Sequence, residues 1–323
     1  MKKLPPLKFI PQPKDRIWGG DNLKKKLGKP FLGNNVGESW EISTIKNSVS
    51  IVSDGILKGE KLDKLIIDYK YRLIGKSVFK KFGYIFPLLI KYIDAKHDLS
   101  VQLHPNDSIA KKYHNSNGKL EMWYIIKSSP EAKISVGFKE NITREKYLTY
   151  LKNNNLEKIL HFKKVKPCEA FLINPGVVHS IGKNILLAEI QQASDITYRI
   201  YDYGRKDKIG NERELHTDFA NRSIKLEKDE NYYLKYKPKK NTSVTLAKTK
   251  KFVTKLILVN GEINLNLKKI DSFSIVMCLD GELLYHETNS KKKLSLGETL
   301  FLPAEIELIK IKGKRTKILH IHM

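Results

Sequence analysis

Short runs in which apolar and polar residues alternate make up most of this chain, and this pattern is typical of β-strands. Two nearly continuous apolar stretches, FPLLIKYIDA at 86–95 and EMWYIIK at 121–127, predict buried strands, and SVQLH at 100–104 predicts a shorter one between them. Residues 60–74 instead carry apolar side chains three or four positions apart, which predicts a helix. The chain is therefore expected to be mainly β with a small helical portion.

The other expected elements follow from the same reasoning about periodicity and turn residues. They are a short helix over 107–118, a strand over 131–138, two short helices within 141–162 that break at three asparagines, strands over 169–173 and 185–191, and a loop-rich stretch over 201–225. From about 243 to the end, short β-runs alternate with turns at 280–282, 288–290 and 313–314.

An internal repeat is visible in the β-rich material. The segment GETLFLPAEIEL at 297–308 can be set against CEAFLINPGVVH at 168–179. This register places Glu298 on Glu169, Leu302 on Ile173 and Leu308 on His179. The repeat predicts one small barrel used twice, first in a domain over 1–240 and again in a degenerate domain over 241–323. Because the first copy has polar residues where the second has aliphatic ones, a functional site is expected only in the first.

The charge of the chain is strongly positive, at +25, with 60 Lys and Arg against 35 Asp and Glu. The lysines are spread along the whole length, and no helix-turn-helix, zinc-finger or RNA-binding motif accompanies them. A solvated basic surface is therefore favoured over a nucleic-acid partner, which salt-sensitive gel shifts would reveal. A positive field of this kind favours anionic small substrates.

Cysteine usage and hydropathy indicate where the protein works. Cys168 and Cys278 form no C-x-x-C pair, and two cysteines do not make a disulfide framework. The N-terminal residues 1–15 contain prolines but no apolar segment typical of a signal peptide, and no stretch of 18 apolar residues exists in the chain. A cytoplasmic location without a membrane partner is expected.

Four side chains suggest a metal site. Gln102 and His104 lie two apart and so share one face of the predicted strand. Glu121 opens a strongly apolar strand, and His179 follows the turn NPGVV. Each has an ordinary explanation by itself, such as a strand-end imidazole, an ion pair or a turn cap. Together they offer the nitrogen and oxygen ligands of a divalent cation, although imidazole suits Zn, Fe, Ni and Cu alike.

Cationic residues accompany this set. Asp195 and Arg199 lie four apart in ASDITYRIYDYGR, which is expected to loop over the barrel mouth, where an arginine can hold a phosphate or a reacting oxygen. Lys91 interrupts an apolar run and therefore needs an anionic partner or a wet cavity. Lys119 lies two residues before Glu121, and Arg205 is a further candidate for phosphate.

Four motifs in this order, QLHPND, GKLEMWYII, NPGVVHSIG and SDITYRIYDYGR, resemble the type I phosphomannose isomerases of the cupin superfamily, and in particular their short bacterial form. The resemblance covers nearly the whole chain. It implies two cupin-type (jelly-roll) β-barrels, the second without metal ligands. It further implies reversible conversion of mannose 6-phosphate to fructose 6-phosphate, an aldose–ketose isomerisation through a cis-enediol.

The resemblance also implies particular residues. One Zn²⁺ per chain would be held by Gln102, His104, Glu121 and His179. In the sugar-phosphate pocket it implies catalytic roles for Arg199, Asp195 and Lys119 and substrate-binding roles for Lys91, Lys119 and Arg199. The motifs do not choose the general base among a metal-bound hydroxide, Asp195 and Lys119. Departures from the family are Cys168, where cupins usually have glycine, the pair Asn174-Pro175, and a reduced helical insertion.

Other functions remain open at this point. A non-catalytic metal-cupin that binds a sugar phosphate would keep the metal ligands but would have little need for both Asp195 and Arg199. A cupin oxygenase with iron in the same ligands would need a cosubstrate site, for which no sequence feature speaks. The sequence also leaves open whether the protein is a monomer or a homodimer.

Overall fold

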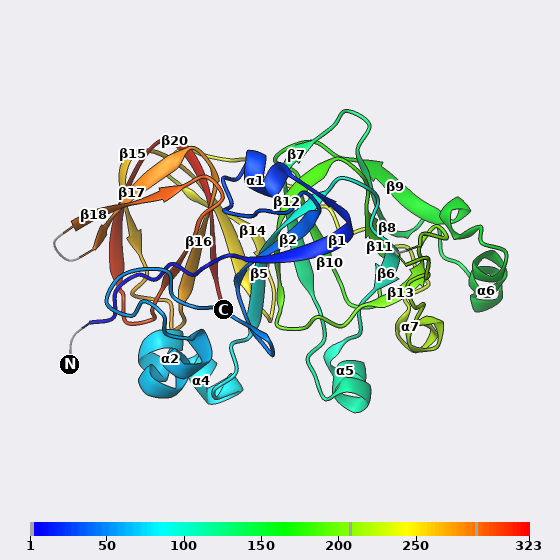
Figure 1. Cartoon of the computed structure of the whole chain (residues 1–323), viewed down its shortest axis with the longest axis horizontal. Helices are drawn as coiled ribbons and strands as arrows, with labels where there is room; N and C mark the ends of the chain where they lie inside the picture. Colours follow the sequence, from blue (N-terminus) through cyan, green and yellow to red (C-terminus); the bar gives the residue numbers. More distant parts are fainter. Residues whose placement is uncertain (1–2, 207–208, 288–289) are drawn as a thin grey trace.

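Two β-rich lobes lie side by side and are joined by segments that cross between them (Figure 1). The computed structural model describes residues 3–206, 209–287 and 290–323. Strands account for 43% and helices for 16% of the structure, which confirms the prediction of a mainly β chain with a small helical portion.

The first lobe consists of two antiparallel sheets that face each other. The six-stranded sheet has the order β1 (Gln12–Gly20), β2 (Val36–Ile42), β5 (Leu88–Ala95), β12 (Ile185–Gln192), β7 (Glu121–Ser128) and β10 (Ala170–Ile173). The five-stranded sheet has the order β13 (Tyr198–Tyr201), β6 (Val101–Leu103), β11 (His179–Ile181), β8 (Lys133–Phe138) and β9 (Leu160–Lys164). Their inner faces share one apolar cluster, in which Trp123 and Leu187 of the first sheet meet Ile134 and Ile181 of the second.

The second lobe is built around two long strands. Its strands are β14 (Ser243–Lys248), β15 (Val253–Asn266), β20 (Leu308–His322), β16 (Ser274–Asp280), β19 (Thr299–Leu302), β17 (Glu282–Glu287) and β18 (Ser290–Ser295). The pairing of β15 with β20 shifts register just before Gly261, which has φ +94° and lies opposite Gly313. Beyond this bend the first half of β20 pairs with β17, whereas its second half pairs with β16. The two long strands therefore enter both walls around an apolar interior.

Helices occupy the edges of the lobes. They are α1 (Asn22–Lys25), α2 (Leu62–Tyr69), α3 (Tyr71–Ile74), α4 (Lys76–Phe82), α5 (Asp107–His114), α6 (Arg144–Lys152), the 3₁₀ turn η1 (Leu156–Lys158) and α7 (Thr217–Ser223), with a small hairpin of β3 (Thr44–Ile45) and β4 (Ser48–Val49). The α2–α4 group packs on the second lobe, where Arg72 pairs with Glu305 at 2.7 Å and Asp271 accepts hydrogen bonds from the amides of Lys76 and Ser77. Among the described residues, no helix is long and apolar enough to cross a bilayer.

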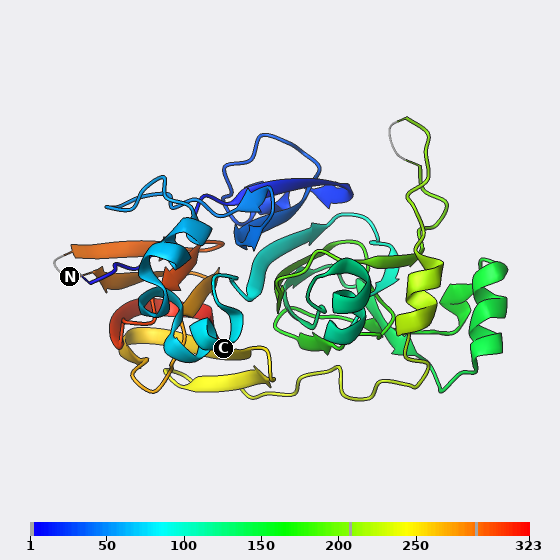
Figure 2. The same ribbon diagram turned by 90° about the horizontal axis from the view of Figure 1, so that it is seen from below.

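One apolar core extends across both lobes. The backbone of Leu7 exchanges two 2.8 Å hydrogen bonds with Phe301 of β19, so the N-terminal segment lies on the second lobe. The Phe86 ring lies 4.7 Å from that of Phe273 and 6.0 Å from that of Phe301. Residues 225–242 cross from the first lobe to the second in an extended conformation (Figure 2). The division of the chain into 1–240 and 241–323 stays a prediction.

Several expected elements differ from the structure. The helix over 60–74 is interrupted at Lys70, whose φ of 49° ends α2 and begins α3. The prediction of a second helix within 141–162 is wrong. Only the three-residue η1 forms there before strand β9 begins. Strand β9 pairs with the edge of β8, and this non-local pairing outweighs the local helical pattern.

Two further corrections concern loops. The loop-rich stretch over 201–225 contains α7, whose Phe219 ring stacks on Tyr198 at 5.4 Å. A helix of seven residues is too short to show helical periodicity on its own. The prediction of a turn at 313–314 is wrong, because β20 continues through these residues as a strand. Residues 288 and 289 of the expected turn at 288–290 lie outside the described residues.

Candidate metal centre and its pocket

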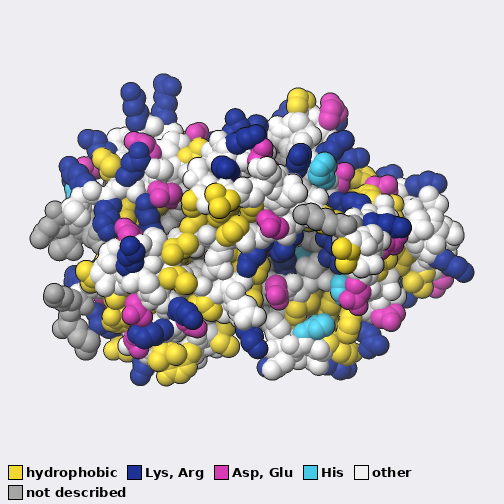
Figure 3. Space-filling model, viewed as in Figure 1, with side chains coloured by type: hydrophobic (Ala, Val, Ile, Leu, Met, Phe, Trp, Pro, Cys, Tyr) yellow, Lys and Arg dark blue, Asp and Glu magenta, His cyan; other side chains and the backbone are white. Residues whose placement is uncertain are grey.

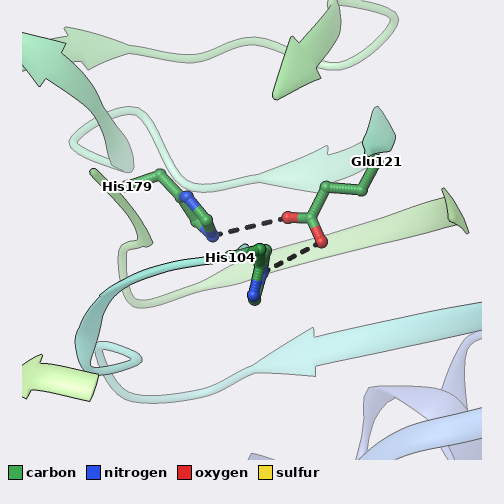
Figure 4. Close-up of side chains that lie close together, drawn as sticks. All are labelled: His104, Glu121 and His179. Carbon is green, nitrogen blue, oxygen red and sulfur yellow. Dashed lines mark ion pairs between the residues drawn. The ribbon is translucent and has the colours of Figure 1, made fainter. Parts of the chain in front are cut away.

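Two imidazoles and a carboxylate converge inside the first lobe (Figure 4). His104 follows β6, Glu121 is the first residue of β7, and His179 is the first residue of β11. The distances are 3.2 Å from His104 Nε2 to Glu121 Oε2 and 3.5 Å from His179 Nε2 to Glu121 Oε1. All ligand atoms lie within 4.8 Å of one another, and each residue is only 1% exposed.

Backbone carbonyls orient both imidazoles. His104 Nδ1 lies 2.9 Å from the carbonyl oxygen of Ile196, and His179 Nδ1 lies 2.9 Å from that of Val177. A carbonyl can only accept a hydrogen bond, so the proton is assigned to Nδ1 in both rings and the Nε2 lone pairs point toward Glu121. His104 Nε2 and Glu121 Oε2 are buried and have no hydrogen-bond partner in the described part of the chain. Buried unpaired acceptors are costly, and a divalent cation fits such a set.

The electrostatics of the cluster favour neutral rings and an ionised carboxylate. Burial, assisted by the positive charge of Lys119, lowers the pKa of His104 to about 3, and burial also lowers the pKa of His179. For Glu121, burial opposes ionisation, but Lys119 and the imidazoles outweigh it and hold its pKa well below the usual range. These are the protonation states in which His and Glu bind metals.

Gln102 lies beside this cluster on β6. It is opposite His179 in the β6–β11 pairing, and its amide nitrogen lies 3.5 Å from His179 Nε2. Because amide nitrogen and oxygen are assigned from their neighbours, the Gln102 amide oxygen can occupy the same place. The structure thus brings Gln102 next to the three other residues, and its role as a fourth ligand stays a prediction.

A cavity of about 490 Å³ opens next to the cluster. Six of the predicted site residues line it: Lys91, Gln102, Lys119, Glu121, Asp195 and Arg199. The loop that carries Asp195 leads into β13, as expected for a segment that returns to the barrel mouth. The fold therefore brings these six residues from four separate stretches of the chain to one pocket.

The lysines of the pocket are held by carboxylates. Lys119 Nζ lies 3.4 Å from Glu121 Oε2. Lys91 Nζ lies 2.8 Å from Glu189 Oε1 and 3.5 Å from Glu38 Oε2. Burial alone lowers the pKa of Lys91, but Glu189 and Glu38 outweigh it and the net shift is upward. The expectation that a lysine in this apolar strand needs an anionic partner is confirmed.

Arg199 and Asp195 lie nearer to solvent. Arg199 donates from Nη1 to the carbonyl oxygen of Glu214 at 2.8 Å, while its buried Nε has no hydrogen-bond partner within residues 3–206, 209–287 and 290–323. Burial and the neighbouring Arg213 lower the pKa of Arg199, although a guanidinium stays charged at neutral pH. Asp195 is exposed at the pocket wall.

Five charged residues of the pocket escaped sequence reasoning: Asp15, Arg16, Glu38, Glu189 and Arg213. Glu189 carried the same signal as Glu121, a carboxylate within an apolar strand, in ILLAEIQ, whereas Glu38 lies in GESWEIS, which is mostly polar. The predicted phosphate candidate Arg205 instead pairs with Asp202, which also binds Arg213. Of these two arginines, Arg213 lines the cavity.

Comparison with known proteins identifies the family of this chain. Residues 7–143 match the model of the phosphomannose isomerase type I catalytic domain. The chain is 42% identical to mannose-6-phosphate isomerase ManA of Bacillus subtilis over 212 residues, a match that spans 65% of each protein. It is 31% identical to YvyI of the same organism, provisionally named a mannose-6-phosphate isomerase, over 97% of this chain and 98% of YvyI. The chain belongs to the type I phosphomannose isomerase family.

The three-dimensional likeness extends over the whole chain. The crystal structure of the mannose 6-phosphate isomerase from B. subtilis covers 99% of this chain, with a TM-score of 0.89 and 29% identity. A structure from Archaeoglobus fulgidus, with a TM-score of 0.80 and 22% identity, shares the fold. Membership of this family of aldose–ketose isomerases and the cupin-type fold, both expected from the motifs, are confirmed.

Proposed function

We propose that this chain is a zinc-dependent mannose-6-phosphate isomerase, which interconverts mannose 6-phosphate and fructose 6-phosphate through a cis-enediol. The observation that carries the proposal is the buried group of His104, Glu121 and His179 beside a cavity rich in cationic side chains. The substrate is inferred from the relatives of this chain, which are named mannose-6-phosphate isomerases.

The donor set suits a metal that must retain positive charge. Two neutral imidazoles, one carboxylate and the Gln102 amide would leave a bound Zn²⁺ with a net charge near +1. Bound there, zinc would supply Lewis-acid stabilisation of the negative charge that develops on the sugar oxygens. A site with three carboxylates would lose this residual charge.

The chain's own residues then have separate tasks. Lys91, Lys119 and Arg199 would bind the anionic substrate, and its binding energy would hold C1 and C2 in register. Arg199 would hold charge on the reacting oxygen with its Nε–H, which has no partner among the residues that the structure describes. Asp195 and Lys119 are the candidates to move the proton between C1 and C2, a step worth roughly 10²–10⁴-fold.

The first experiment is a coupled assay with mannose 6-phosphate on metal-stripped protein, before and after zinc addition. We expect zinc to restore turnover in the wild type and in His97→Ala, which changes an exposed histidine, but not in His104→Ala. Stoichiometric zinc without turnover in the wild type would overturn the isomerase and favour a metal-cupin that only binds a sugar phosphate. Turnover that is independent of added metal would overturn the role of zinc.

The proposal extends to the location, the oligomeric state and the surface charge of the protein. We propose a cytoplasmic location, from the cysteine usage, and a chain that acts as a monomer or a homodimer. Lys and Arg are scattered over both lobes on the face drawn in Figure 3, which supports a general positive field rather than a nucleic-acid footprint.

A further inference from the structure

A row of alternating charges crosses the pocket wall, one from each of four neighbouring strands. Arg16 of β1, Glu38 of β2, Lys91 of β5 and Glu189 of β12 follow the order of the strands in the sheet. Arg16 Nε lies 2.9 Å from Glu38 Oε1, and the Lys91 ammonium lies between Glu38 at 3.5 Å and Glu189 at 2.8 Å. Glu38 and Lys91 thus each lie between two opposite charges.

Glu38 is fixed more firmly than its neighbours. Its Oε2 accepts a 2.6 Å hydrogen bond from Trp40 Nε1, and its Oε1 accepts one from Arg16. Burial opposes ionisation of Glu38, but Lys91, Arg16 and Trp40 outweigh it and lower its pKa to about 2. A buried carboxylate with these partners is a permanent, immobile negative charge.

The Lys91 ammonium is shared unequally between two carboxylates. Its shorter contact is to Glu189, which is itself held by a 2.9 Å hydrogen bond from Trp123 Nε1. Without an attraction from the other side, a flexible lysine would settle fully on Glu189 and move away from Glu38. The charge of Glu38 opposes that movement across the same sheet.

We propose that Glu38 is a positioning residue for substrate binding, which keeps the Lys91 ammonium at the pocket wall where it meets the anionic substrate. This inference rests on the proposed function, because it takes Lys91 as a substrate-binding residue. It adds a residue that acts through Lys91.

The variant Glu38→Gln tests this role, because glutamine keeps the length of the side chain and can still accept from Trp40. We expect a crystal structure of the variant to show Lys91 Nζ displaced toward Glu189. We expect KM for mannose 6-phosphate to rise about tenfold while kcat changes less than about threefold, the signature of lost uniform binding. In Lys91→Met, adding Glu38→Gln should change KM no further.

A matched control lies on the same strand. Glu41 forms a 2.7 Å buried pair with Lys29, which lies over the ring of Tyr92 in the core shared by the two lobes. Glu41→Gln removes a buried carboxylate of the same kind outside the pocket. It should lower the free energy of unfolding and leave KM unchanged.

Two outcomes overturn the inference. An unmoved Lys91 together with a raised KM means that Glu38 contacts the substrate itself, and an unchanged KM means that it has no role in binding. Failure of the isomerase proposal is recognised separately, by a zinc-loaded wild type without turnover. Calorimetric titration of the same variants with fructose 6-phosphate would then replace KM, with the same expected weakening of about tenfold.

Discussion

The two lobes place different chemistry on the same strand position. In the first lobe Glu121 begins β7 and lies opposite Ile173. In the second lobe Ser274 begins β16 and lies opposite Leu302, the residue that the sequence repeat sets on Ile173. Where the first barrel has a carboxylate aimed at two imidazoles, the second has a hydroxyl that lies 3.0 Å from His320 Nε2.

The two lobes also share a hydrogen bond in the turn that precedes each partner strand, β10 in the first lobe and β19 in the second. Glu169 Oε2 accepts a hydrogen bond from the amide of Lys166 at 2.8 Å, and Glu298 Oε2 accepts one from Ser295 at 2.6 Å. These matching contacts support the repeat. The comparison teaches that backbone hydrogen bonds preserve a barrel whichever side chains face inward, whereas a buried polar group persists only where it has a partner.

The largest expected effect is the loss of the carboxylate of the first barrel. Glu121→Gln leaves Lys119 unpaired and removes the only charged donor of the cluster, so we expect zinc content to fall below one per chain. Turnover should fall by more than the roughly 100-fold that loss of an outer partner costs a metal site. Metal analysis and the coupled assay measure both, with Glu169→Gln as control. Full zinc occupancy in Glu121→Gln would show that zinc binding does not need this carboxylate, and would contradict the contrast drawn between the lobes.

Transferring the carboxylate to the second barrel should cost stability without creating a site. Ser274→Glu buries a charge at a position that is 1% exposed, and the unfolding free energy should fall by about 3 kcal/mol or more. Ser274→Ala, which loses only the contact to His320, should cost about 1 kcal/mol. Urea unfolding gives both values. A stable Ser274→Glu protein that binds a second zinc would contradict the prediction.

His320 should make the second lobe sensitive to acid. Burial lowers its pKa to about 3 in the folded chain, against an ordinary value of 6.5. Below pH 6.5 the unfolded chain gains a proton that the folded chain refuses, so this stability is lost as pH falls toward 3. His320→Asn should therefore lose roughly 1.5 kcal/mol less than the wild type between pH 6.5 and 5.

Urea unfolding at both pH values measures that difference. His97→Asn, which changes an exposed histidine, should keep the wild-type dependence on pH. Equal losses in His320→Asn and the wild type would show that His320 does not govern the acid response.

The smallest effect concerns the shared turn. Cys168 has a φ of 72°, and Gly297, set on it by the repeat, has a φ of 81°. Because a side chain is strained in this region, Cys168→Gly should raise the unfolding free energy by about 0.5 kcal/mol. Gly297→Ala should lower it, since its Cβ would meet the carbonyl oxygen of Leu27 at 2.5 Å. Thermal unfolding compares the two, and destabilisation of Cys168→Gly would contradict this account.

Much of the site could be found from the sequence because its residues share one signal. Glu121 and Lys91 are ionisable groups within apolar strands, and such groups need partners. Glu189 carried the same signal, but both Glu189 and Glu38 could be matched to Lys91 only through sheet neighbours far apart in the chain. The strand β9 was missed for a related reason, since its pairing with β8 is non-local.

The sequence by itself determined the strand-rich composition, the repeat, the residue types of the candidate site and the family, because periodicity and motif order are local properties of the chain. The tertiary structure decided which lobe supports which helix, how Lys91 is shared between carboxylates, and that Arg213 rather than Arg205 lines the pocket. These depend on strand order and on contacts between residues distant in sequence. Spacing along the chain does not specify such contacts, since they form only when the sheets assemble.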